Sequence, residues 1–264
     1  LEENGTVDNY RLVDYTDNSS GDVVYDYNFD NENPFLSGAV EDGKFVTKGV
    51  GILLPPQGIS TFRKEVTPGN HLVSAKLYTA GLGVYDVFIN GERVGTRQDD
   101  GAVVYDELKP GYTHHSKRTI YHTYDVTEMV NGAETSVISA HVTSGWWSGQ
   151  AAGFYGKEEA FRAQLLLTYE DGSTRVIGTD RSWKTALQGP ILYGDIYNGE
   201  TYDANADLSF RQTGYDDSKW TYADLNKEFN GILCPQDGPS VRVRNDLELT
   251  AQSAVVYRGV VDEN

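Results

Sequence analysis

Apolar and polar residues alternate along much of the chain with the period of two that half-buried β-strands require. In the segment from residue 71 to 80, one face carries Val73, Ala75 and Leu77, and the other face carries more polar side chains. Two further segments alternate in the same way, and their inward positions are Tyr85, Val87, Ile89, Ile138, Ala140 and Val142. The pattern predicts a series of short strands, each with one face toward a shared core.

Glycine-containing turns separate these strands. Asn90-Gly91 is the strongest of them, because both central residues of a type I′ hairpin turn need positive φ. Asp42-Gly43 and Asp171-Gly172 repeat the same type of turn. Around the last of these, residues 161–167 alternate before the turn and residues 174–176 alternate after it, which predicts a second hairpin.

Helical signals are confined to one short segment. We expect a turn or two of helix at Thr127 to Asn131, capped by Asp125 or Thr127 and closed by Gly132. Many short strands with Gly, Asn and Asp turns at close intervals are typical of a β-sandwich. The chain is therefore predicted to be all-β.

Composition limits the classes of function. With 264 residues and 39% apolar residues the chain can bury a sizeable core, and no apolar run is long enough to span a membrane. A formal net charge of −17 makes nucleic acid an unfavourable partner. Cys234 has no second cysteine to pair with and is expected to be a small buried residue. The chain begins at Leu1 without a basic-then-apolar leader, so we expect a piece of a longer protein.

No motif of a catalytic or metal centre is complete. Asp203-x-Asn205-x-Asp207 imitates half of an EF-hand loop, but the glycine and the final glutamate are missing, so only a calcium site of another shape stays open. The histidines His114, His115 and His122 have no matching Cys or Glu spacing and are expected on loop and strand surfaces. With 39 carboxylates, sequence alone cannot select a pair for glycoside hydrolysis.

The stretch SGWWSGQAAGFYG places Trp146 and Trp147 side by side at a strand end among small residues. Adjacent residues of a strand point to opposite faces, so at most one of the two is expected to be buried. Aromatic rings at strand ends suit sugar binding, because the apolar face of a pyranose stacks on a ring. Trp183 and Trp220 are instead expected in the core.

Several motifs resemble, in order, the N-terminal β-domain of bacterial α-L-rhamnosidases of glycoside hydrolase family 78. They are GLGVYDVFINGERVG, DELKPGYTHHSKRTIYHTYDVTEMVNGAETSVISAHVTSGWWSG, FRAQLLLTYEDGSTRVIGTDRSWKT and GDIYNGETYDAN. The resemblance covers roughly Phe62 to Leu225, about three fifths of the chain. The later RVRNDLELTAQSAVVYRG resembles the segment leading into that family's next β-domain.

The resemblance implies a jelly-roll, galactose-binding-like β-sandwich. Alternation within residues 1–57 predicts additional N-terminal strands on the same sandwich. We expect residues 1–57 to pack on or extend the sandwich, 58–228 to form it, and 229–264 to link it to a following β-domain. In that family a separate (α/α) barrel removes terminal α-L-rhamnose with inversion, so this chain is expected to carry no catalytic residue. The implied partners are a rhamnose-containing glycan or the enzyme's own catalytic domain, in a periplasmic or extracellular location.

Some domains of this kind bind L-rhamnose through calcium, and the segment from 195 to 203 carries the best oxygen donors. The resemblance thereby implies a calcium set of Asp195, Asn198 and Glu200. Ligand contacts are expected from these three together with Asp203, Trp146 and Trp147, one of the tryptophans forming the stacking platform. Alternatively, Asn198-Gly199 is a plain turn and Glu200 a structural hydrogen-bond acceptor.

One departure from the family bears on specificity. Related enzymes usually read Gly-Asp-Gly-Trp-Tyr where this chain has Thr143 to Trp147, TSGWW, so a carboxylate is lost and an indole gained. Three hypotheses follow: a sugar-binding accessory domain, a structural domain that packs on the catalytic barrel, and a self-sufficient hydrolase. Exposed aromatics beside residues 195–203 favour the first, an exposed apolar patch favours the second, and turnover by this chain alone favours the third.

Overall fold

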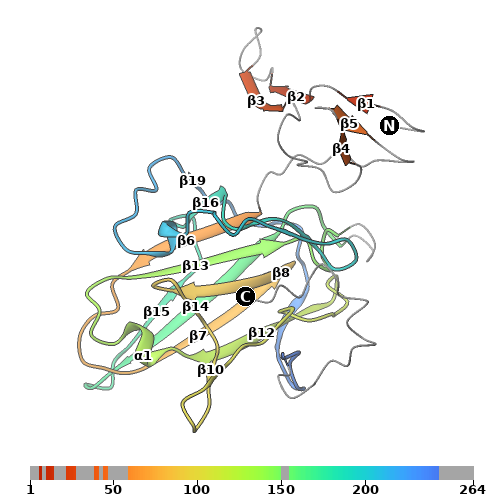
Figure 1. Ribbon diagram of the computed structural model, residues 1–264. Coiled ribbons are helices and arrows are strands. Elements are labelled where there is room, and N and C mark those ends of the chain that lie inside the picture. The colour runs from red at the N-terminus through yellow and green to blue at the C-terminus, as the bar shows by residue number, and fades with distance from the viewer. Residues whose placement is uncertain are drawn as a thin grey trace.

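The computed structural model describes residues 59–149 and 155–243, together with the strand pairing of an N-terminal segment. Two sheets, whose strands are antiparallel except for one parallel pair, face each other and form a β-sandwich (Figure 1). In spatial order, the five strands of the first sheet are β15 (Thr174–Gly178), β14 (Ala160–Tyr169), β7 (Leu72–Leu82), β12 (Arg118–Asp125) and β20 (Ile232–Pro235). In spatial order, the six strands of the second are β19 (Thr221–Tyr222), β16 (Lys184–Leu187), β6 (Ser60–Val66), β13 (Ser136–Thr143), β8 (Val84–Ile89) and β9 (Glu92–Arg93). The all-β prediction is confirmed.

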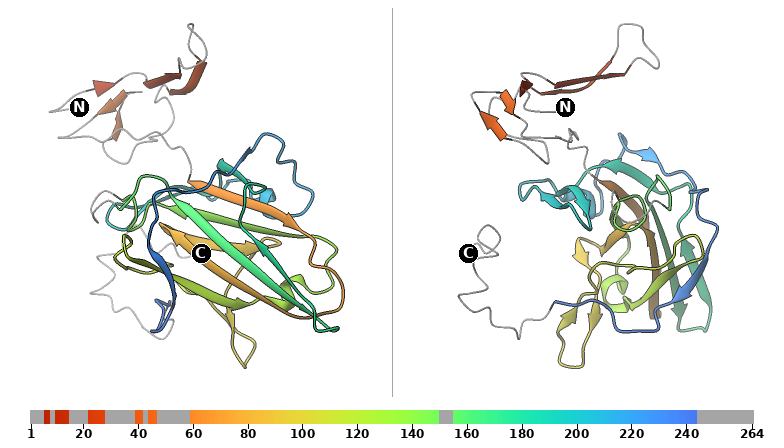
Figure 2. Two further views of the ribbon diagram at one scale, coloured as in Figure 1. Left: turned by 180° about the vertical axis from the view of Figure 1, so that it is seen from behind. Right: turned by 90° about the vertical axis from the view of Figure 1, so that its right-hand side faces the viewer.

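Smaller elements decorate the sandwich. They are the ribbons β10 (Thr96–Arg97) with β11 (Val103–Val104) and β17 (Ile191–Asp195) with β18 (Gly199–Tyr202), the helix α1 (Thr127–Val130) and the 3-10 helix η1 (Ser209–Arg211). Two views from other sides show β17 and β18 at the same end of the sandwich as the connection that follows β13 (Figure 2). That end carries the residues discussed below.

The core lies between the two sheets and is made by the inward positions that the alternation predicts. Leu77 of β7, Leu165 of β14 and Ile138 of β13 are fully buried there. Each such side chain stabilises the fold by about 1.5–3 kcal/mol relative to an exposed position. Trp183 belongs to this core, and Trp220 is buried against Phe210, with ring centroids 5.7 Å apart. The prediction for both tryptophans is confirmed.

The predicted helix and the Asn90-Gly91 turn are also confirmed. Asp171-Gly172 joins β14 to β15, but only Gly172 has positive φ, +81°, so this turn is not of type I′, and Asp42-Gly43 lies outside the described residues. Asn90 and Gly91 have φ of 51° and 86°, as a type I′ turn requires, and they join β8 to β9. Helix α1 is preceded by Asp125, whose Oδ1 accepts the backbone N–H of Thr127 at 3.0 Å. Thr127 Oγ1 in turn accepts the backbone N–H of Ala75 at 2.8 Å, which fixes the helix to β7.

Two local predictions are wrong. Val73 is 59% exposed, whereas Leu72 is buried, because the pairing of β14 with β7 shifts between Thr168 and Tyr169. This bulge skips Val73, so the inward set begins one residue earlier than simple alternation predicts. Cys234 is only partly buried, because it lies on β20, a strand at the edge of its sheet.

Two of the three histidines expected at the surface are instead buried. His115 and His122 are 1% and 5% exposed, whereas His114 is exposed. His122 stacks parallel to Tyr124 with an interplanar angle of 8°. Its Nδ1 lies 3.7 Å from Asp106 Oδ2. Lone histidines carry no strong burial signal in a sequence, since their rings pack well once a carboxylate or hydroxyl is near.

Five strands lie among the described residues of the N-terminal segment, where the alternation predicts added strands. They are β1 (Thr6–Val7), β2 (Tyr10–Asp14), β3 (Asp22–Tyr27), β4 (Ala39–Glu41) and β5 (Lys44–Val46). They pair in the orders β1-β5-β4 and β2-β3. The packing of residues 1–57 on the sandwich, and the boundaries at 58 and 229, stay predictions.

Candidate functional site: an aromatic surface beside the β17–β18 ribbon

The turn after β13 separates the two adjacent tryptophans. Gly145 has φ of +48°, and a Cβ at this residue would lie 2.6 Å from the backbone nitrogen of Val84, so the turn requires glycine. The backbone N–H of Trp147 donates to the Ser144 carbonyl at 3.0 Å, and Ser144 Oγ donates to the Gly194 carbonyl of β17 at 3.0 Å. The turn is thus closed on itself and attached to the β17–β18 ribbon.

Trp147 points into the protein and is 1% exposed. Its Nε1 donates to the Glu158 carbonyl at 2.9 Å, and its own carbonyl accepts the Tyr155 N–H at 3.0 Å. His115 meets the indole edge to face at 5.9 Å between centroids. A Cβ at Gly156 would collide with the indole, so the loop lies directly on it. Trp147 therefore anchors residues 155–158 and offers no free face to a ligand.

Trp146 lies on the opposite side of the turn and is only partly buried. Tyr112 and Tyr197 meet it edge to face, with ring centroids 5.0 Å and 5.7 Å from the indole. Both tyrosines are 61% exposed. We call Trp146, Tyr112 and Tyr197 the aromatic cluster. Tyr155 extends it, because its hydroxyl lies 3.5 Å from that of Tyr112.

The β17–β18 ribbon positions Tyr197. Asp195 Oδ1 accepts the backbone N–H groups of Tyr197 at 2.8 Å and Asn198 at 3.0 Å, and Gly199 has φ of +83°. Asn198 Nδ2 donates to the Tyr193 hydroxyl at 3.2 Å. The reading of Asn198-Gly199 as a turn is thus confirmed, and Asp195 has a clear role in holding it.

The predicted calcium donors do not converge. In the ribbon, Asp195 pairs with Gly199 and Glu200 pairs with Gly194. Since paired residues share a face and successive residues alternate, Asp195 and Glu200 project to opposite faces. Within residues 59–149 and 155–243, no group of three or more His, Cys, Asp or Glu could hold a metal. The set of Asp195, Asn198 and Glu200 therefore does not fit a calcium ion.

The two remaining acidic residues of the prediction lie apart from the cluster's rings. Burial, with a smaller contribution from the negative charge of Asp86, raises the pKa of Glu200. Asp203 Oδ1 accepts the Asn205 N–H at 2.9 Å, and its own N–H donates to the Pro190 carbonyl at 2.7 Å. Asp203 therefore closes the turn that follows β18. Of the six predicted residues, Trp146 belongs to the aromatic cluster, and Asp195 and Asn198 border it.

A partly buried ionic cluster, in which only Lys109 is fully enclosed, holds the loop that carries Tyr112. Lys109 Nζ donates to Asp86 Oδ1 at 2.8 Å, and Arg93 bridges Asp86 at 2.9 Å and Glu107 at 2.7 Å. Burial alone would raise the pKa of Asp86, but Lys109 and Arg93 outweigh it, and the pKa is lowered. The Tyr85 N–H also donates to the Lys109 carbonyl at 3.0 Å. These contacts fix residues 107–109 against β8, just before Tyr112.

Sequence reasoning did not single out Tyr112 and Tyr197. Each follows or precedes a glycine turn, in KPGY and IYNG, and turn-flanking tyrosines are the signal that could have found them. The pairing of both with Trp146 depends on contacts 34 and 51 residues apart along the chain, which no local pattern shows.

None of the helices in the described part of the chain has the length and apolar character needed to cross a bilayer.

The comparisons with known proteins agree with one another. A family model described as the α-L-rhamnosidase N-terminal domain matches residues 70–245. An α-L-rhamnosidase of Streptomyces avermitilis is 36% identical over 188 residues, which cover 68% of this chain and 17% of that protein. An α-L-rhamnosidase of Alteromonas sp. is 31% identical over 188 residues, which cover 69% of this chain and 19% of that protein. The chain thus spans less than a fifth of the length of these relatives.

Solved structures give the same result. The Streptomyces avermitilis α-L-rhamnosidase complexed with L-rhamnose matches with a TM-score of 0.63 and 30% identity, over 77% of this chain and 20% of that chain. The native α-L-rhamnosidase of Aspergillus terreus matches with a TM-score of 0.58 and 26% identity, over 91% of this chain and 32% of that chain.

Proposed function

Since the chain belongs to the α-L-rhamnosidase N-terminal domain family, we propose that it is a non-catalytic accessory domain of a rhamnoside-cleaving glycoside hydrolase that binds a rhamnose-type sugar. The aromatic cluster is the binding surface in this proposal. Trp146 supplies the stacking face, Tyr112 and Tyr197 flank it, and their hydroxyls accept and donate hydrogen bonds to the sugar.

The observation that carries the proposal is the exposure of the two tyrosines beside a half-buried indole. Tyr112 and Tyr197 are each 61% exposed although both contact Trp146. Large aromatic side chains gain free energy by burial, so a group held at the surface by ordered turns is typical of a recognition surface. Carbohydrate ligands suit it, because their apolar faces stack on rings and their hydroxyls bond to tyrosine.

A second function is supported by the outer edge of the first sheet. Ile232 and Leu233 of β20 are 67% and 37% exposed, and Val241 and Val243 beyond them are 53% and 69% exposed. An apolar edge of this kind suits contact with another domain of the same enzyme, which the relatives' greater length leaves room for. In this role the domain supports the catalytic barrel and needs no ligand.

Calorimetric titration of the chain with L-rhamnose tests the first function. We expect weak binding by the wild-type chain, and a loss of at least about tenfold, or about 1.4 kcal/mol, in Tyr197→Ala. Tyr222→Ala is the matched control, because Tyr222 is equally exposed at 66% but lies on β19, away from the cluster. Absence of heat in the wild-type chain would leave the interdomain role as the function.

Two further arms separate the remaining alternatives. A repeat of the titration with excess chelator should give the same heat, because the proposed calcium donors project to opposite faces of their ribbon. Loss of the heat on chelation would contradict that geometry. Incubation with an aryl α-L-rhamnoside should release no aglycone, and turnover would instead support a self-sufficient hydrolase.

A further inference from the structure

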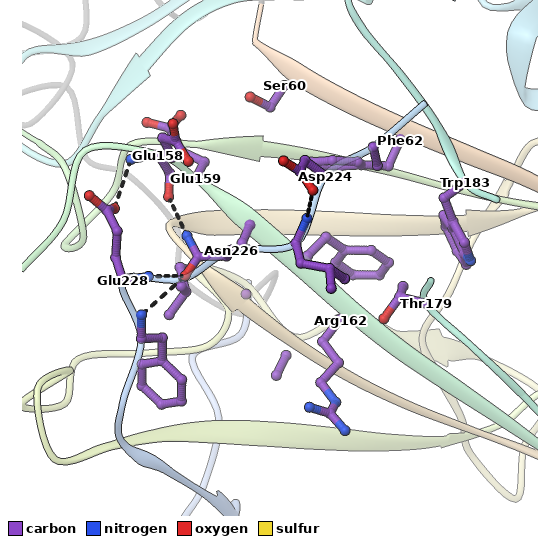
Figure 3. A pocket seen from close by; sticks show the side chains of 18 of the residues that line it. Ser60, Phe62, Glu158, Glu159, Arg162, Thr179, Trp183, Asp224, Asn226 and Glu228 are labelled. Atoms are coloured by element: carbon purple, nitrogen blue, oxygen red, sulfur yellow. Dashed lines mark hydrogen bonds between the residues drawn. The ribbon is translucent and has the colours of Figure 1, made fainter. Parts of the chain in front are cut away.

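A second concave site lies at the start of β14, apart from the aromatic cluster. It is a groove of about 890 Å³ bounded by β6, β7, β14, β16 and the segment of residues 223–229 (Figure 3). This volume lies within the range of about 300–1,000 Å³ that small-molecule sites occupy. The groove reaches the interior because β15 pairs with β14 only from Gln164 onward, which leaves the first residues of β14 uncovered on that side.

The wall of the groove is preformed by hydrogen bonds. Glu228 Oε2 accepts the backbone N–H groups of Lys157 at 2.9 Å and Glu158 at 3.2 Å. Asn226 Oδ1 accepts the N–H groups of Glu228 at 3.0 Å and Phe229 at 3.1 Å (Figure 3). Trp147 Nε1 also holds the Glu158 carbonyl, so this wall is fixed before a ligand binds.

Three aromatic rings form the floor. Phe62 and Phe161 stack with centroids 6.4 Å apart and an interplanar angle of 25°, and Phe161 packs on Trp183 at 6.1 Å. Phe62 and Phe161 are only partly buried, although both contact the main core. Their exposed faces give the groove an apolar base suited to the C–H face of a sugar ring.

An unsatisfied hydroxyl also borders the groove. Thr119 of β12 lines it, is 1% exposed, and its Oγ1 has no hydrogen-bond partner among residues 59–149 and 155–243. A buried hydroxyl without a partner destabilises the fold, so each such group calls for an explanation. A ligand hydroxyl in the groove would supply the missing bond.

The charges on the rim limit the ligand. Carboxylates outnumber cationic side chains around the groove. The carboxylates are Glu158, Glu159, Asp180, Asp224 and Glu228, and the cationic side chains are Arg162 and Lys227. An anionic ligand is therefore repelled, whereas a ligand with many hydroxyls finds acceptors in the carboxylates and donors in Arg162 and Asn226. A simple cation would leave Thr119 and the aromatic floor without a matching group.

We propose that this groove binds a neutral pyranose unit of a glycan, as a site separate from the aromatic cluster. One face of the sugar ring rests on Phe161 and Phe62, and its hydroxyls bond to Thr119 and to the rim carboxylates. The two sites lie on either side of Trp147, which supports the wall of one and the turn of the other. A glycan chain would thus be held at two points.

The test uses nuclear magnetic resonance on the Tyr197→Ala chain, in which the aromatic cluster is impaired. The probes are methyl α-L-rhamnopyranoside, methyl β-D-glucopyranoside and methyl β-D-galactopyranoside, with D-glucuronate as the anionic control. We expect at least one neutral glycoside to shift the Trp183 indole N–H resonance in a saturable way, and glucuronate to leave it unchanged. If no neutral probe shifts it, or if glucuronate alone does, the proposal is overturned.

Substitution of Thr119 separates ligand binding from a structural role. Thr119→Val keeps the side-chain shape and removes the unpartnered hydroxyl, so the free protein should melt at the same temperature or higher while affinity for the neutral glycoside falls about tenfold. Thr119→Ser, which keeps the hydroxyl, should retain most of that affinity. Equal affinity of all three chains would contradict the proposal. Because these affinities are read from the Trp183 resonance in the Tyr197→Ala background, they are independent of binding at the aromatic cluster.

Discussion

The two sides of the turn at residues 144–149 carry the same kind of side chain in opposite environments. Trp147 is enclosed by His115 and the 155–158 loop and donates its indole N–H within the protein. Trp146, one residue earlier, meets two rings among the described residues, and both of these rings are mostly exposed. Trp147 thus serves the stability of the fold, whereas its neighbour Trp146 is available for recognition. Substitutions on the two sides of the turn should therefore affect stability and ligand binding separately.

The largest expected effect is on the buried side. Trp147→Ala should lower the free energy of unfolding by about 3–5 kcal/mol, because it leaves a cavity and removes the indole hydrogen bond to the Glu158 carbonyl. Urea denaturation monitored by far-ultraviolet circular dichroism measures this loss. A change below about 1 kcal/mol would show that Trp147 is not an anchor.

Acid should weaken the same buried side. Burial, with a smaller contribution from His114, lowers the pKa of His115 to about 4. Between about pH 6.5 and pH 4 the unfolded chain takes up a proton that the folded chain does not, so stability falls as pH falls through that range. The loss from His115 reaches up to about 3 kcal/mol and is absent above about pH 6.5.

The variant His115→Gln tests how much of the loss of stability in acid comes from His115. His141 on β13 has its pKa lowered to about 4 as well, chiefly by burial and against the opposing charge of Asp86. In His115→Gln, the slope of unfolding free energy against pH between 4 and 6.5 should therefore fall to about half, with His141 supplying the rest. An unchanged slope in denaturation curves across this range would mean that His115 is protonated in the folded state.

A smaller effect is expected where the turn joins the ribbon. Ser144→Ala removes the hydrogen bond to the Gly194 carbonyl and should cost about 1 kcal/mol, because only one partly buried bond is lost. Thermal unfolding of wild type and variant side by side gives this difference. The substitution should also weaken rhamnose binding, because the turn that carries Trp146 is then held less firmly against the ribbon that carries Tyr197. Unaltered affinity would show that the ribbon is held independently.

The smallest effect on stability is expected on the exposed side. Tyr197→Ala should change the free energy of unfolding by less than about 0.5 kcal/mol, because the side chain is 61% exposed. Denaturation in urea, with Tyr222→Ala as the reference, measures this. A loss above about 2 kcal/mol would mean that Tyr197 supports the fold rather than a ligand.

The parts of the fold that follow from local pattern were predictable from the sequence. Alternation around Leu77 and Leu165 identifies inward faces, and Asn90-Gly91 identifies a hairpin, because each depends only on neighbouring residues. Val73 shows where alternation stops being sufficient, since a bulge is set by the partner strand. The same limit applies to His115, whose burial depends on Trp147, 32 residues away.

The candidate site was predictable only in part. The sequence indicates that one of two adjacent tryptophans stays accessible, but the side depends on the turn conformation at Gly145. Asp195 and Glu200 look like joint ligands along the chain, yet the register of β17 with β18 places them on opposite faces. Long-range contacts and strand register are the physical information that a single sequence does not carry.

The most direct test of sugar binding at the aromatic cluster is a titration of the chain with L-rhamnose, followed through the indole N–H resonances of Trp146 and Trp147. Sugar binding at the cluster predicts a saturable shift of the Trp146 signal and a much smaller change at Trp147. A Trp146 signal that stays fixed at saturating sugar would show that the cluster does not bind rhamnose, and would leave this surface to contact with another domain.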